Sequence, residues 1–292
     1  MEKLIDLIRE ALQLPDAKIE NIETTGGMTN LNYLVTIDSA DFIVRIPGNG
    51  TEEFIDRRIE KENLEFASSL GINPELRYFN LETGLKVTKK IVNATTLTPT
   101  IASEEKTMVK IAEIFRTVHN SNRSMSNRFE LFEMMANFEE LALEAGAEFF
   151  DGFDEVKKDI NTLQQYFDDL KIKEVPCHID PACSNFIISD EDKVYLIDWE
   201  YSGMFDPMWD IAAHALEAKL TETEEAFFVR QYFGREATVA EEKRMLLHKI
   251  FQDYLWSLWT LFKEEKGDDF GAYGKNRFER ARKNIEIFNQ AE

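Results

Sequence analysis

Cysteine and histidine are scarce in this chain of 292 residues, and their spacing excludes two common kinds of site. Two cysteines, Cys177 and Cys183, are too few for a disulfide scaffold, and they stand too far apart for a C-x-x-C redox or zinc pair. The four histidines, at positions 119, 178, 214 and 248, lack the spacing of metal ligands. The sequence therefore indicates neither a disulfide-stabilised nor a zinc-binding protein.

Positive charge is also in short supply. Lysine and arginine number 34 against 55 aspartates and glutamates, which gives a formal net charge of −21. Nucleic acids and anionic membrane surfaces bind through basic patches, so neither is an expected partner. The negative charge suits a cationic small molecule, although acidity that serves solubility alone explains it as well.

Long apolar runs are missing too. No segment approaches the roughly 18 consecutive apolar residues of a membrane span. The N-terminal stretch MEKLIDLIREAL is amphipathic and of mixed charge, and it lacks the apolar core of a signal peptide. These absences predict a cytoplasmic protein that does not associate with membranes.

Apolar and aromatic residues are plentiful, at 43% apolar content with 22 Phe and 4 Trp, which is enough for one large domain or two lobes. The first 92 residues are rich in strand patterns and contain one long helical pattern. Strands are expected within 19–37, 41–47, 71–80 and 85–92, and helices over 2–13 and 52–70. The polar stretch NATTLTPT, with its proline, then predicts a linker over residues 93–99.

Residues 100–292 are mainly helical by the same criterion. Ser103 is the expected cap of a helix that runs to about His119. Further helices are expected at 128–146, 152–169, 207–219, 222–233, 239–263 and 274–290. A small β-rich lobe, a linker and a larger helical lobe form a bilobal α+β arrangement, in which ligands commonly bind between the lobes.

One hairpin interrupts the helical part, and it carries the residues with the clearest chemistry. NFIIS (185–189) and VYLID (194–198) are its strands, so Asn185 and Asp198 are expected to lie close together with Asp180 above them. Amide and carboxylate oxygens at one point suit Mg²⁺, and a further carboxylate suits a general base. The spacing H-x-D-x₄-N followed by I-D is typical of a kinase catalytic loop and its metal-binding Asp. The alternative is a set of polar residues that only cap the hairpin, and His178 is expected to support the loop by hydrogen bonding.

Three motifs give the chain a family resemblance. HIDPACSN followed by LIDWEYSGMFDPMWDIAAH, the C-terminal DYLWSLWTLFKEEKGDDFGAYGKNRFERA, and GGMTNLNYLV near the N-terminus resemble the choline/ethanolamine kinase family. This family lies within the aminoglycoside phosphotransferase-like group of the protein-kinase-like fold. The likeness covers roughly residues 20–285 and is nearest to the bacterial choline kinases that supply phosphocholine for surface glycans.

The resemblance implies roles for the hairpin residues and for the N-terminal lobe. Asp180 would be the catalytic base, Asn185 and Asp198 would bind Mg²⁺, and Glu200 would support the metal site. Arg45 would hold the ATP phosphates and pair with Glu60, for which Glu62 is a rival. Without a Walker A or G-x-G-x-x-G sequence, GGMTN would cover the phosphates through its backbone and side chains, with Gly27, Thr29 and Asn30 as the expected contacts. Arg45 also fits an exposed position on an edge strand, and Glu60 a solvated helix face.

The same resemblance places the acceptor among one acidic and four aromatic residues: Tyr201, Glu217, Trp256, Trp259 and Tyr273. Aromatic faces attract a quaternary ammonium such as that of choline, at about 0.5–2 kcal/mol per contact. The alternative for LWSLW is ordinary core packing.

The implied function is an ATP- and Mg²⁺-dependent kinase of the choline hydroxyl, with small molecules as its partners. Ethanolamine, thiamine or an aminoglycoside could replace choline. A non-catalytic pseudokinase scaffold and a plain interaction protein are the other classes considered.

Overall fold

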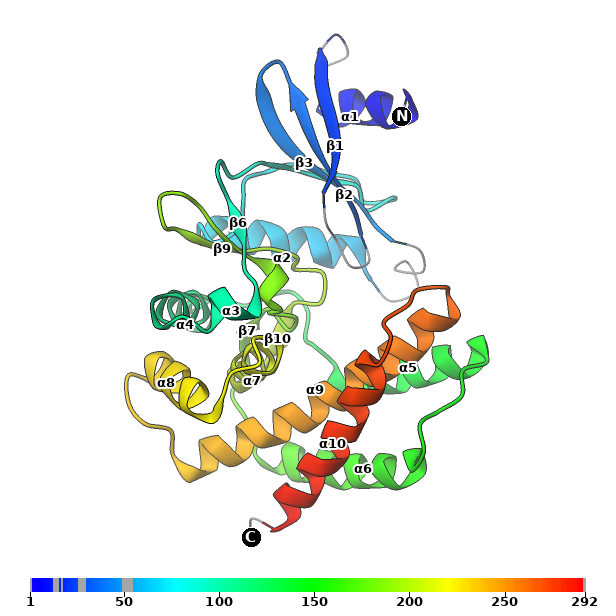
Figure 1. Cartoon of the computed structure of the whole chain (residues 1–292), viewed down its shortest axis with the longest axis vertical. Coiled ribbons are helices and arrows are strands. Elements are labelled where there is room, and N and C mark those ends of the chain that lie inside the picture. Colours follow the sequence, from blue (N-terminus) through cyan, green and yellow to red (C-terminus); the bar gives the residue numbers. More distant parts are fainter. Residues whose placement is uncertain (1, 13–15, 17, 26–29, 49–54, 291–292) are drawn as a thin grey trace.

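A computed structural model describes the chain except residues 1, 13–15, 17, 26–29, 49–54 and 291–292. The N-terminal part is an antiparallel sheet of five strands in the order β1-β2-β3-β5-β4 (Figure 1). These strands are β1 (Ile19–Thr25), β2 (Leu31–Ile37), β3 (Ala40–Ile46), β4 (Leu76–Phe79) and β5 (Lys86–Lys89). The strands expected from the sequence are confirmed: β1 and β2 lie within 19–37, β3 is shifted by one residue from 41–47, and β4 and β5 are shorter than the expected 71–80 and 85–92.

Two helices accompany this sheet, as the sequence predicts. Helix α1 (Glu2–Ala11) buries Ile8 against the sheet, among Val35, Val44 and Val87. Helix α2 (Arg57–Ser69) is inserted between β3 and β4 and begins after Asp56, whose side chain accepts hydrogen bonds from the first turn. Part of the predicted start of this helix lies outside the described residues.

The predicted linker has more structure than expected. Strand β6 (Thr95–Thr96) pairs with β8 (Phe186–Ile188), and Pro99–Ala102 form the short helix α3. Thr98 caps α3, since its hydroxyl accepts a hydrogen bond from the Ile101 amide at 3.3 Å. The predicted capping role of Ser103 is wrong: Ser103 ends α3, and α4 follows Glu104, which makes no side-chain cap. The division at 93–99 into two lobes stays a prediction.

The remainder of the chain is mainly helical, as predicted. Its helices are α4 (Glu105–His119), α5 (Leu131–Ala145), α6 (Phe153–Asp169), α7 (Pro207–Glu217), α8 (Glu222–Phe233), α9 (Val239–Glu265) and α10 (Tyr273–Gln290). Helix α9 is the centre of this half, because nearly every side chain from Met245 to Lys263 is buried. Figure 1 shows α10 lying along it, and Gly274 permits this approach, since a Cβ there would lie 2.8 Å from the Thr260 side chain.

Short strands hold the loops beside these helices. The predicted hairpin is β8 and β9 (Val194–Leu196). The interpretation of this hairpin as the sole clear strand pair is incomplete, because β7 (Val175–Cys177) pairs with β10 (Gly203–Phe205). Asn185 lies in a 3₁₀ turn before β8 rather than within the strand, and Asp198 follows β9 by two residues.

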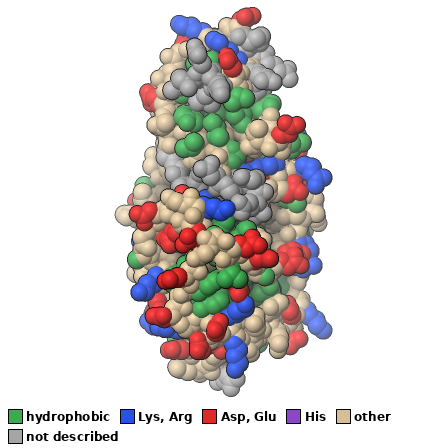
Figure 2. All heavy atoms as spheres, turned by 90° about the vertical axis from the view of Figure 1, so that its right-hand side faces the viewer, with side chains coloured by type: hydrophobic (Ala, Val, Ile, Leu, Met, Phe, Trp, Pro, Cys, Tyr) green, Lys and Arg blue, Asp and Glu red, His purple; other side chains and the backbone are tan. Residues whose placement is uncertain are grey.

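The surface reflects the composition of the chain. On the face shown in Figure 2, acidic side chains border an area of hydrophobic side chains. Among the described residues, no helix is both long enough and apolar enough to cross a bilayer.

Candidate active site

The loop that carries Asp180 is fixed from below by a buried carboxylate on α7. Asp210 accepts hydrogen bonds from the backbone amides of His178 (2.7 Å) and Ile179 (2.8 Å), and its Oδ2 lies 3.1 Å from His119 Nε2. Ile179 has φ = 77°, a left-handed conformation that is strained for a β-branched residue. The Asp210 carboxylate thus holds the backbone in an otherwise unfavourable turn immediately before Asp180.

His178 supports the same loop, as predicted. Its Nε2 lies 2.8 Å from the Ile197 carbonyl oxygen, and its ring packs edge-on against Trp199 at 4.7 Å. The hydroxyl of Ser202 donates to the His178 carbonyl at 3.0 Å. Burial lowers the pKa of His178, so the ring is neutral at pH 7 and its role is to fix the loop.

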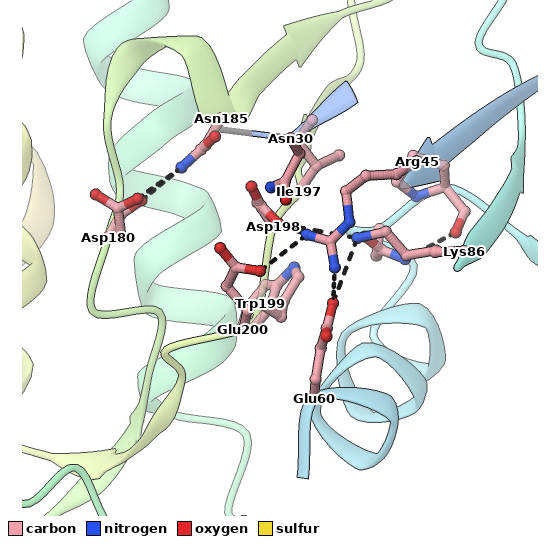
Figure 3. Close-up of polar contacts among 12 residues, drawn as sticks. Asn30, Arg45, Glu60, Lys86, Asp180, Asn185, Ile197, Asp198, Trp199 and Glu200 are labelled. Atoms are coloured by element: carbon pink, nitrogen blue, oxygen red, sulfur yellow. Dashed lines mark hydrogen bonds and ion pairs between the residues drawn. The ribbon is translucent and has the colours of Figure 1, made fainter. Parts of the chain in front are cut away.

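Asp180, Asn185 and the segment before Asp198 are joined by hydrogen bonds (Figure 3). The Asn185 side-chain amide donates to the Asp180 carbonyl at 2.8 Å and to its carboxylate at 3.2 Å. The Asn185 carbonyl accepts from the Ile197 amide at 2.9 Å. Burial and the charge of Asp198 raise the pKa of Asp180 to about 6, against the opposing effects of Arg277 and Asn185. This value is suitable for a group that accepts a proton near neutral pH.

Arg45 is the centre of a buried charge cluster between β3, α2 and the loop after β9 (Figure 3). Its guanidinium donates to Glu60, to Asp198 and, at 3.1 Å, to Glu200. The alternative of an exposed edge position is wrong, since β3 lies between β2 and β5 and Arg45 is 4% exposed. The partner of Arg45 is Glu60 rather than Glu62, whose exposed side chain accepts from Ser126.

Two further cations in this cluster were missed by the sequence analysis. Arg57 lies 2.8 Å from Glu60 and 3.9 Å from Glu200, and the Lys86 ammonium lies 3.9 Å from both Glu60 and Asp198. Burial and Arg45 lower the pKa of Lys86. The signal for Lys86 is its position directly opposite Arg45 in the β3–β5 pairing, which is visible only once the strand order is known.

Glu200 and Asp198, two acidic members of the cluster, differ in pKa. Burial and the neighbouring Asp198 raise the pKa of Glu200 to about 7. Burial also acts to raise the pKa of Asp198, but Arg45 and Lys86 outweigh it, so this pKa lies below its ordinary value. Of these two carboxylates, Asp198 is therefore the one that stays ionised throughout the physiological pH range.

Oxygen donors for a metal ion are grouped at this point. Glu60, Asp198 and Glu200 each offer a carboxylate oxygen within 4.8 Å of the others. Asn185 donates through its amide nitrogen, which leaves its side-chain oxygen as an acceptor. An all-oxygen set that includes the ionised carboxylate of Asp198 fits a hard cation such as Mg²⁺.

The expected phosphate-covering residues are described only in part. Gly27 and Thr29 lie outside the described residues. Asn30 is buried, and its side-chain oxygen accepts from the Gly48 amide at 3.2 Å, which ties the start of β2 to the segment after β3.

Three of the four aromatic residues predicted for the acceptor lie together. The rings of Trp256 and Trp259, on α9, meet edge-on with centroids 6.1 Å apart. Tyr201 packs on Trp256 at 5.3 Å, and Phe270, which the sequence analysis missed, lies 5.0 Å from Trp259. Both tryptophans also belong to the hydrophobic core of the helical half, so the core interpretation of LWSLW holds in addition to any binding role.

Glu217 and Tyr273 form a second group with Arg277, another residue that the sequence analysis missed. Arg277 pairs with Glu217 and stacks on the Tyr273 ring at 4.8 Å, and the Tyr273 hydroxyl donates to Glu217 at 3.4 Å. Asp253 holds Arg277 at 3.0 Å. Burial and the charge of Asp180 both raise the pKa of Tyr273, so this group lies within electrostatic reach of Asp180.

The fold and this arrangement define a class of protein. A five-stranded antiparallel sheet with one inserted helix stands above a helical half, and between them lie a loop Asp, an Asn five residues later and an Asp after a hairpin. These are the parts of a phosphotransferase with a kinase-like fold.

Comparison with known proteins agrees with this classification. A profile of the family described as choline/ethanolamine kinase matches residues 21–282, and the chain belongs to this family. Family membership makes it a nucleotide-binding enzyme that acts on small-molecule substrates.

Individual relatives extend over nearly the whole chain. Protein LicA of Haemophilus influenzae strain Rd is 32% identical over 269 residues, which cover 89% of this chain and 99% of that protein. The crystal structure of choline kinase LicA from Streptococcus pneumoniae has a TM-score of 0.86 at 38% identity and covers 98% of this chain and 99% of its own. A structure of LicA in complex with AMP has a TM-score of 0.86 at 37% identity, with 98% of each chain covered. Spectinomycin phosphotransferase, at 15% identity and a TM-score of 0.61, shares the fold.

Proposed function

We propose that this enzyme transfers the γ-phosphoryl group of ATP, as its magnesium complex, to the hydroxyl of choline. The observation that carries the proposal is the hydrogen-bonded loop that holds Asp180 and Asn185 beside Asp198, in a chain of this family. Relatives of nearly the same length include a protein described as a choline kinase. We assign the nucleotide to residues 1–92, the hinge to 93–99, and the catalytic and acceptor groups to 100–292.

Asp180 acts on the acceptor hydroxyl. It accepts the hydrogen bond of that hydroxyl and then its proton, while the choline oxygen forms a bond to the γ-phosphorus. The bond from this phosphorus to the β–γ bridging oxygen breaks, and ADP leaves. Most of the rate enhancement comes from positioning and charge stabilisation.

The buried charge cluster around Arg45 is assigned to binding of the nucleotide phosphates. Asn185 and Asp198 would hold Mg²⁺ with the support of Glu200, and the ion would neutralise charge on the phosphates. Arg45 is buried beside these residues and oriented by Glu60, so it supplies a fixed positive charge for the same phosphates. Gly27, Thr29 and Asn30 are the proposed contacts from the loop before β2.

The acceptor cation binds among Tyr201, Trp256, Trp259 and Tyr273. A quaternary ammonium has no N–H to donate, so aromatic faces suit it better than hydrogen-bond acceptors do. Glu217 contributes a carboxylate nearby, but its charge is largely balanced by Arg277.

Ethanolamine is the second candidate acceptor. A probable ethanolamine kinase of Arabidopsis thaliana is 25% identical over 287 residues, which cover 88% of this chain. The primary ammonium of ethanolamine has three N–H donors that need acceptors. The carboxylate of Glu217 is a poor acceptor for them, because it is already paired with Arg277.

The test is acceptor-dependent release of ADP. The purified enzyme is given Mg-ATP with choline, with ethanolamine or with no acceptor, and the phosphorylated product is identified by mass spectrometry. Phosphocholine formed with a kcat/KM well above that for ethanolamine supports the proposal. Equal ADP release with and without acceptor contradicts it.

A further inference from the structure

Lys86 occupies an unusual position for a lysine. It is the first residue of β5, is 7% exposed, and stands directly opposite Arg45 in the β3–β5 pairing. Figure 3 shows its side chain directed into the cluster of Arg45, Glu60 and Asp198. A lysine at such a position normally has a hydrogen-bonded partner, because burying an ammonium group is costly.

The Lys86 ammonium has no such partner within the described part of the chain. Its nearest acceptors are one oxygen of Glu60 and one of Asp198, each at 3.9 Å, which is beyond hydrogen-bonding distance. The three N–H groups are therefore close to negative charge, but they donate to none of it.

The internal charges of the cluster do not explain why the lysine is there. Arg45 already donates to Glu60, Asp198 and Glu200, and Arg57 makes a second contact to Glu60 at 2.8 Å. Each carboxylate thus has a hydrogen-bonded cation, while Lys86 and Arg45 repel one another. An ammonium whose donors have no hydrogen-bond partner among the described residues, beside a fixed guanidinium and next to proposed metal ligands, matches the needs of an anion with several oxygens.

We propose that Lys86 is a second cationic ligand for the phosphate groups of the nucleotide, working beside Arg45. The inference rests on the proposed function, because that function brings a polyphosphate to this cluster. Arg45 is held by three carboxylates and acts mainly as a fixed charge. Lys86 supplies the free donors that bond directly to phosphate oxygens.

The chain offers a matched control on the same strand. Lys89 ends β5 and is exposed, and the charge change of K89M equals that of K86M. Calorimetric titration of the full-length protein with ATP, ADP, AMP and adenosine separates phosphate recognition from base recognition. We expect K86M to weaken ATP binding about 10- to 100-fold, the effect of losing a charge-assisted hydrogen bond, and to leave adenosine within about 2-fold. K89M should change neither, and K86R should recover part of the ATP affinity. The first member of the series adenosine, AMP, ADP, ATP to show the loss identifies the phosphate that Lys86 contacts.

Two results overturn the inference. One is wild-type ATP affinity in folded K86M, and the other is an equal loss for adenosine and ATP, which indicates a structural role. Thermal unfolding of each variant checks the fold, and K86Q replaces K86M if the latter does not fold. Failure of the proposed function is seen separately in the wild type, either as no nucleotide binding or as nucleotide binding without transfer to choline.

Discussion

Asp210 offers the sharpest test of how this active site is held in place. The substitution Asp210→Ala removes the acceptor of two buried backbone amides, those of His178 and Ile179, and the partner of His119. Each buried donor left without a partner costs about 1–3 kcal/mol, so the two amides alone amount to about 2–6 kcal/mol. The free energy of unfolding of a typical domain is about 5–15 kcal/mol, so this loss of stability is large but does not by itself abolish folding.

The strained backbone at Ile179 determines which part of the structure changes when Asp210 is replaced. The left-handed conformation of Ile179 costs about 1–3 kcal/mol, and the Asp210 carboxylate is what opposes its relaxation. Without that carboxylate the turn relaxes and Asp180 is displaced. A displacement of about 1 Å at a reacting group lowers the rate on the order of 100-fold. Asp210→Asn keeps one acceptor oxygen, so we expect it to lose roughly half as much stability.

The assay pairs urea denaturation with steady-state kinetics, and Asp206 provides the control. Asp206 is as deeply buried, caps α7 through the Met208 amide, and lies 2.7 Å from His248, and none of its described hydrogen bonds or ion pairs is with the catalytic loop. Asp206→Ala should lose comparable stability and keep the kcat of the folded fraction. The reasoning is refuted if folded Asp210→Ala turns over as fast as folded Asp206→Ala.

Four further predictions concern the proposed chemistry. Asp180→Asn should nearly abolish transfer while ATP affinity stays within a few-fold. In the wild type, kcat/KM for the acceptor should rise with pH through a pKa near 6, because Asp180 is protonated below that value and cannot accept the proton of the hydroxyl. If the residual activity of Asp180→Asn still rises through the same pKa, the titrating group is not Asp180. Asp198→Ala should remove productive Mg-ATP binding, and an unchanged dependence of the rate on Mg²⁺ would place the metal elsewhere. Trp256→Ala and Trp259→Ala should each raise KM for choline by about 2- to 30-fold, which corresponds to the loss of about 0.5–2 kcal/mol per cation–π contact. KM for ATP should change little. An unchanged KM for choline in folded variants rules out the aromatic site.

The sequence predicts those features that depend on neighbours along the chain. The hairpin after Asp180 has apolar strands and an acidic turn, and the helices have apolar residues at helical spacing, so both are recognisable locally. The pairing of β7 with β10 was missed because, unlike β8 and β9, these two strands are not joined by a turn, and they contain Pro176 and Gly203, residue types that are depleted in strands. The error at Ser103 has a similar cause: Pro99 and Thr98 start a helix of their own within the expected linker.

Residues that act across long distances could not be found in this way. Lys86 becomes meaningful only when β5 is known to pair with β3. The contacts of Arg277 with Glu217 and Asp253 join three helices, and no local pattern connects them. The two tryptophans show a second limit of prediction from the sequence. Spacing indicates a shared helix face, but it does not distinguish a buried face from a binding face, and here the two coincide.

That coincidence on α9 has a consequence for how the acceptor range of such an enzyme can change over evolution. Trp256 and Trp259 are 7% and 8% exposed, and they pack within the core of the helical half. Reducing either side chain to enlarge the site leaves a cavity that costs about 3–5 kcal/mol, a large share of a marginal stability. Variation is less costly at Glu217, which is 24% exposed at the end of α7 and outside that core. New acceptors are therefore more accessible through Glu217 than through the tryptophans themselves.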